Sequence, residues 1–99
     1  MGRNEELMNF KDYIRTHNIL ADGSFGTYYA EKYHTSEAPE YANIYHKDRV
    51  TKIHSSYLEA GAKLIRTNTF AANTMSMQKD FSFVRENIQE AVSLARIAI

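Results

Sequence analysis

Apolar residues recur at intervals of three and four in three stretches of the chain. The first covers residues 5–17 and stops at His17-Asn18. The second covers residues 48–60, with an aspartate in its first turn and Gly61 directly after it. The third begins at Val84 and continues to the last residue without a stop signal. This spacing predicts three amphipathic helices.

Two short apolar runs lie between these helices and predict strands. Residues 19–21 are followed by a polar turn with two glycines, and residues 64–65 follow Gly61 closely and are followed by a polar segment. The tyrosine-rich stretch 28–45, which contains the single proline, predicts a connection with one or two short helical turns. Residues 71–83 are predicted to form a loop or an irregular helix.

The order of these elements predicts an α/β fold. Strands that alternate with helices are typical of a parallel sheet with crossover helices. Two parallel strands cannot form a covered sheet alone, because each needs neighbours and both faces need helices. No repeat or linker divides the chain. We therefore interpret residues 1–99 as part of one larger α/β domain with no internal boundary.

Composition excludes several classes of function. The 12 basic residues balance the 12 acidic ones, so nothing indicates a nucleic-acid partner. The absence of cysteine excludes disulfide scaffolds and cysteine-ligated metal sites within these residues. No apolar run approaches the ~20 residues of a membrane span, and the start of the chain does not resemble an export signal. We expect a cytoplasmic protein with no membrane partner.

The polar turn of residues 22–27 is the first candidate site. Its glycines allow a ligand to approach the backbone, and successive N–H groups in such a turn can hold a carboxylate. Asp22, at the end of the predicted strand, offers an acceptor for an ammonium group, so the pattern suits an amino acid. The alternative is an ordinary turn with Asp22 as a local cap. The turn matches neither a dinucleotide fingerprint nor a phosphate loop.

A second candidate site follows the other predicted strand, at residues 67–70. The carboxyl ends of parallel strands share the face on which α/β folds bind ligands, so both candidates point to one pocket. The alternative is that Thr67 and Asn68 cap the next loop. The histidines lack metal-ligand spacing, with His54 expected to be partly packed on its helix. The tyrosines and methionines are interpreted as packing residues.

Four stretches carry a resemblance to a known family. Residues 20–27 are similar to the motif LDGAMGT, residues 37–43 to PELWN, and residues 50–62 to V…IH..YLEAGA. Residues 67–73 match TNTF.AN almost letter for letter. In this order and spacing, over about residues 18 to 98, the chain resembles the homocysteine S-methyltransferase family.

The resemblance implies a fold, an activity and a set of site residues. The fold would be the N-terminal portion of a (β/α)8 TIM barrel, comprising a leading helix and about two βα units. The activity would be methyl transfer to the thiol of L-homocysteine in methionine biosynthesis. Asp22 would contact the substrate ammonium, and the backbone of the next three residues would receive its carboxylate. The implied substrate-binding residues are Asp22, Gly23, Ser24, Phe25, Asn68 and Phe70.

The chemistry of the family implies parts that this chain lacks. A zinc ion held by three cysteines from later strands would activate the thiol, and this sequence has no cysteine. We therefore expect a fragment with no catalytic or metal-binding residue, inactive alone. The methyl donor (folate, betaine or S-methylmethionine) is undetermined, and a folate-linked domain downstream is one possibility. The alternative is a non-catalytic, self-associating α/β module or a binder of small amino acids.

Overall fold

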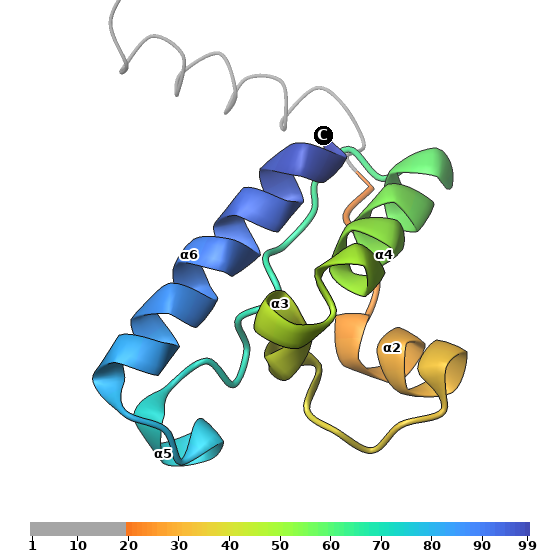
Figure 1. Ribbon diagram of the computed structural model, residues 1–99. Coiled ribbons are helices and arrows are strands. Elements are labelled where there is room, and N and C mark those ends of the chain that lie inside the picture. Colours follow the sequence, from red (N-terminus) through yellow and green to blue (C-terminus); the bar gives the residue numbers. More distant parts are fainter. Residues whose placement is uncertain (1–19) are drawn as a thin grey trace, which may run out of the picture.

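The computed structural model describes residues 20–99 as a set of packed helices joined by extended segments (Figure 1). The helix expected over residues 5–17 lies outside the described residues. The helical elements, in chain order, are α2 (Phe25–Tyr33), the 3-10 helix η1 (Pro39–Tyr41), α3 (Ala42–Tyr45), α4 (Lys47–Glu59), α5 (Thr74–Met77) and α6 (Phe81–Ala98).

The expected α/β fold, with two βα units of a TIM barrel, is wrong for the described residues. They contain no strand, and the two segments predicted as strands meet in one isolated parallel bridge, between Ala21 and Leu64. The N–H of Asp22 donates to the carbonyl of Leu64 at 2.9 Å, and the N–H of Lys63 donates to the carbonyl of Leu20 at 2.7 Å. The contact between these two short segments is therefore a single bridge and not a ladder.

The two longest helices confirm the helical patterns of the sequence. α4 has almost the same bounds as the predicted helix 48–60. Gly61 follows it with a φ of 108°, a conformation that favours glycine. α6 begins three residues before Val84, because the side chain of Asp80 accepts a hydrogen bond from the N–H of Phe83 at 2.9 Å. The short helix α5 lies in the predicted irregular stretch.

The nine-residue helix α2 was not predicted, since its first residues were interpreted as a turn. The side chain of Ser24 accepts a hydrogen bond from the N–H of Thr27 at 3.3 Å and caps the helix. The helix ends at His34, which adopts the left-handed conformation. The polar turn after Ala21 therefore leads directly into a helix N-terminus.

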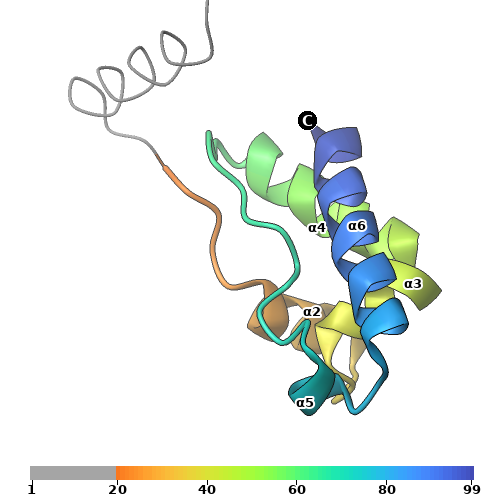
Figure 2. The ribbon, with the colours of Figure 1, turned by 90° about the vertical axis from the view of Figure 1, so that its left-hand side faces the viewer.

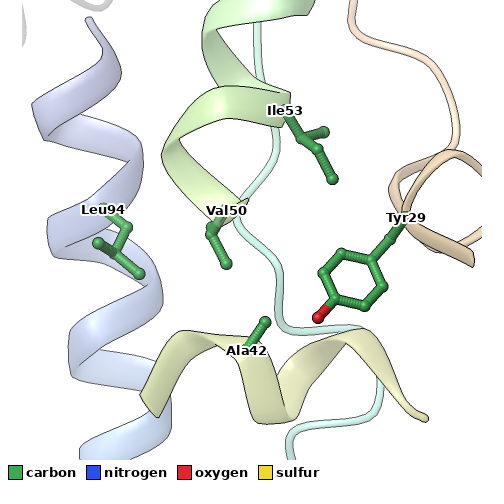
Figure 3. Close-up of a cluster of buried hydrophobic side chains, with 5 residues drawn as sticks. All are labelled: Tyr29, Ala42, Val50, Ile53 and Leu94. Carbon is green, nitrogen blue, oxygen red and sulfur yellow. The ribbon is translucent and has the colours of Figure 1, made fainter. Parts of the chain in front are cut away.

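The core lies where α2, α3, α4 and α6 meet (Figure 3). α4 packs against α6, and α3 contacts both. Figure 2 shows the extended segments before α2 and after α4 running beside each other next to these helices. The buried apolar cluster comprises Tyr29, Ala42, Val50, Ile53 and Leu94. Among residues 20–99, no helix is both long and apolar enough to cross a membrane.

Candidate functional site

A pocket of about 870 Å³ lies where the two extended segments end. Its wall is built from the turn that leads into α2, from η1 and from the segment 66–70. All six residues that the sequence predicts as substrate-binding line this pocket. The complete lining is Asp22, Gly23, Ser24, Phe25, Gly26, Thr27, Pro39, Glu40, Arg66, Thr67, Asn68, Thr69 and Phe70.

Asp22 is held by Arg66. Its Oδ2 accepts from the backbone N–H of Arg66 at 3.1 Å, and its Oδ1 accepts from the Arg66 Nε at 3.0 Å. The Nη2 of Arg66 donates to the carbonyl oxygens of Asp22 and Gly23, each at 3.1 Å. The Asp22 side chain is 2% exposed and that of Arg66 is 68% exposed. The carboxylate is thus fixed at the pocket wall by a cation that stays in contact with solvent.

Tyr57 of α4 contacts the turn and is not among the residues that line the pocket. Its hydroxyl donates to the carbonyl of Ser24 at 2.8 Å. A Cβ on Gly23 would lie 3.0 Å from this hydroxyl, which is tighter than an ordinary contact, so glycine allows the close approach. The turn is therefore positioned by α4, and the first N–H groups of α2, which have no partner within a helix, follow it.

Three buried asparagines connect the pocket wall to the helices. Asn43 of α3 donates through Nδ2 to the carbonyl of Asn68 and to Oδ1 of Asn87, both at 2.8 Å. The Nδ2 of Asn68 donates to the Pro39 carbonyl at 2.7 Å and to Oδ1 of Asn43 at 3.2 Å. Asn87 of α6 donates to the carbonyl of Glu40 at 2.8 Å. This asparagine network fixes η1 and residue 68 relative to α6.

The predicted site residues differ in how they line the pocket. Asn68 is buried and uses both amide donors within the asparagine network, so its side chain holds the wall together. Phe70 is fully exposed. The ring of Phe25 packs toward the core, with its centroid 5.4 Å from that of His54 and 6.2 Å from that of Tyr29. Phe25 therefore has its backbone in the pocket wall and its ring among core residues.

Comparison with known families identifies the chain. The family model described as homocysteine S-methyltransferase matches residues 19–99. The chain belongs to the homocysteine S-methyltransferase family. The match covers every described helix and the whole pocket lining, so the pocket lies within the part of the chain that is homologous to this family.

In this homocysteine S-methyltransferase family member, the described residues do not form a zinc site. Within residues 20–99, no three histidine or carboxylate side chains gather closely enough to hold a metal ion, and the sequence contains no cysteine. Structural and catalytic zinc ions take three or four such ligands. Residues 20–99 therefore do not supply a ligand set for zinc.

Sequence reasoning missed three residues around the pocket. Arg66 directly precedes the second candidate site, but nothing in the pattern paired it with Asp22, which lies 44 positions earlier. Glu40 belongs to the stretch that resembles PELWN, and that motif is the signal that could have found it. Asn87 lies on α6 within a helical pattern, and no sequence signal distinguishes it from a surface asparagine.

His54 of α4 packs against the ring of Phe25 and is completely buried, more deeply than the partial packing expected from the sequence. Neither ring nitrogen has a hydrogen-bond partner among residues 20–99. Burial lowers the pKa of His54 below its ordinary value of 6.5, and the negative charge of Asp22 opposes this shift. The histidine is therefore held in its neutral form beside the site.

The stability of the protein should depend on pH through His54. The His54 side chain of the unfolded chain binds a proton more readily than the buried side chain of the folded protein. The free energy of unfolding is therefore highest above the ordinary histidine pKa and decreases as the pH falls below that pKa. We expect the midpoint temperature of unfolding to fall between about pH 7.5 and pH 5.5. His54→Leu should reduce this fall, whereas His34→Asn, at an exposed position, should not. A pH dependence that His54→Leu leaves unchanged would contradict this assignment.

Proposed function

We propose that this chain supplies the amino-acid recognition part of a methyltransferase that methylates L-homocysteine in methionine biosynthesis. The observation that carries the proposal is the convergence of all six sequence-predicted site residues on one pocket, within a chain of this family. Residues 1–99 would act as a single unit in this role. The pathway and a cytoplasmic location are parts of the proposal that rest on the family resemblance.

The two ends of the pocket wall suit the two charged groups of an amino acid. The backbone of Gly23, Ser24 and Phe25, at the N-terminus of α2, offers N–H groups and a positive helix dipole to the substrate carboxylate. Asp22 offers the substrate ammonium the acceptor positions that Arg66 leaves open, since a carboxylate has about four. Asn68 and Phe70 would form the opposite wall.

Activation of the thiol is assigned to residues outside this sequence. In the proposed complete enzyme, a zinc ion bound by cysteines would hold the thiol as a thiolate, the form that attacks a methyl group. The methyl donor would likewise be bound by other parts of the protein. The described residues would bind and orient the amino-acid end of the substrate, which brings its thiol to a fixed place.

The isolated 99-residue chain should not transfer methyl groups. We expect no methionine when the chain is incubated with L-homocysteine, zinc and each of three donors: methyltetrahydrofolate, betaine and S-methylmethionine. The reason is that no cysteine is present to hold the activating metal. Mass spectrometry of the products provides the measurement. Enzyme-dependent formation of methionine above the blank would refute this part of the proposal.

A second candidate function, self-association, is favoured by exposed apolar side chains. Phe81, Ile88 and Val92 recur at helical spacing on α6, Ile99 directly follows this helix, and all four are exposed in the described structure. Analytical ultracentrifugation over a range of protein concentrations distinguishes the candidates. A monomer that binds L-homocysteine supports the recognition role, and a stable oligomer without affinity for amino acids supports a self-associating module.

A further inference from the structure

Glu40 is a buried acidic residue in the wall of the pocket. It is 3% exposed, and its Oε1 accepts a hydrogen bond from the backbone N–H of Ala71 at 3.2 Å. Its Oε2 is buried and has no hydrogen-bond partner among residues 20–99. A buried carboxylate oxygen without a partner is costly, because the desolvation of the charge is not compensated. One oxygen of the Glu40 carboxylate therefore has no hydrogen-bond donor beside it among these residues.

The position of Glu40 is fixed by its backbone. Its carbonyl accepts from Nδ2 of Asn87, and the carbonyl of the preceding Pro39 accepts from Nδ2 of Asn68. The same buried network holds the segment that supplies the Ala71 N–H, through the hydrogen bond from Asn43 to the Asn68 carbonyl. The backbone that carries the carboxylate is therefore held by Asn87 of α6 and, one residue earlier, by Asn68 of the segment 66–70.

The charges of the pocket leave Glu40 without a counterion. Three charged residues line the pocket, and two of them, Asp22 and Arg66, pair with each other. No described cation forms an ion pair with Glu40. The pocket wall thus carries one uncompensated negative group, and that group has an oxygen in need of a donor.

We propose that Glu40 accepts a hydrogen bond from the ammonium group of the amino-acid ligand and selects ligands that carry this group. The inference rests on the proposed function, in which Asp22 binds the substrate ammonium, and it adds Glu40 as a second carboxylate that binds the same group. A ligand ammonium supplies both the missing donor and the missing positive charge. Ligands without it leave the buried oxygen unpartnered and are rejected.

Two ligands that differ only in the ammonium group test this proposal. L-homocysteine and 4-sulfanylbutanoic acid share the thiol and the carboxylate, and only the first has an amine. In NMR titrations of the 99-residue chain, Glu40→Gln should weaken L-homocysteine binding by about tenfold or more, since a charge-assisted hydrogen bond is lost. The affinity for 4-sulfanylbutanoic acid should not fall. Glu37→Gln, the same change at an exposed position three residues away, should alter neither affinity.

A second measurement avoids dependence on the folding of the variant. In the wild-type chain, the ¹³C resonance of the Glu40 carboxyl should shift on titration with L-homocysteine and stay unchanged with 4-sulfanylbutanoic acid. Equal losses for both ligands in Glu40→Gln, or no loss, would overturn the inference, as would an unresponsive Glu40 carboxyl. If the wild-type chain does not bind L-homocysteine, the proposed function itself fails. If it binds and only Glu40 is unaffected, the proposed function stands without this residue.

Discussion

Replacing Asn43 by alanine should lower the free energy of unfolding by about 2–4 kcal/mol. Asn43 makes three hydrogen bonds inside the core, two as donor and one as acceptor. Alanine removes all three and leaves buried groups of Asn68 and Asn87 without these partners. An unsatisfied buried polar group costs more than the net gain from a made hydrogen bond, so the losses accumulate. Urea denaturation followed by circular dichroism gives the free energy.

Asn73→Ala provides the matched control for Asn43. Asn73 makes a single capping hydrogen bond, accepting from the N–H of Ser76 at 2.8 Å at the start of α5. Loss of such a cap costs about 1 kcal/mol, so this variant should be clearly the more stable of the two. Equal stabilities for the two variants would show that the asparagine network does not hold the pocket wall to α6.

Asp22→Asn should weaken L-homocysteine binding by about 1–3 kcal/mol, or about 5- to 150-fold in the dissociation constant. The change keeps the shape of the side chain and removes its charge, so the substrate ammonium loses a charge-assisted hydrogen bond. It also weakens the contact between Asp22 and the Nε of Arg66, which frees the guanidinium at the pocket wall. Isothermal titration calorimetry with L-homocysteine measures the effect.

Asp48→Asn makes the same chemical change away from the pocket. Asp48 lies exposed in the first turn of α4 and lines no part of the pocket. The affinity of the Asp48→Asn variant for L-homocysteine should equal that of the unmodified chain. If Asp22→Asn binds as tightly as Asp48→Asn does, Asp22 is not part of the substrate site, and its role is limited to holding Arg66.

Local patterns were enough to predict the long helices. α4 and α6 each bury one face, so apolar residues recur at the helical interval along their whole length. The short helix α2 was not predicted, because a turn with two glycines leads into it and because several of its residues are aromatic. Glycine and aromatic residues are weak helix formers. Its start depends on the Ser24 cap, which is a single side-chain contact.

The strands were predicted wrongly because strand formation depends on partners that a sequence segment does not contain. Residues 19–21 and 64–65 have the composition of strands, but in the described structure their contact is one bridge. A helix satisfies its backbone hydrogen bonds internally, whereas a strand forms its ladder only with another strand that lies elsewhere in the chain. Composition therefore indicated extended backbone at these places and could not establish a sheet.

The candidate site was predicted in part. The two motifs at residues 22–27 and 67–70 were expected to share one pocket, and the structure brings them together. The contacts that organise this pocket are long-range: Arg66 reaches Asp22, and Asn87 reaches the Glu40 carbonyl from α6. Such pairings depend on the tertiary packing of helices, and no local pattern reports them.

An NMR titration of the 99-residue chain with L-homocysteine tests the central proposal most directly. The proposal predicts that the largest amide shifts occur at Gly23, Ser24 and Phe25, because their N–H groups receive the carboxylate. Smaller shifts should follow at residues 66–70. No saturable shift, or shifts confined to the separate cavity lined by Glu37, Tyr41, Tyr45, His46 and Lys79, would contradict it.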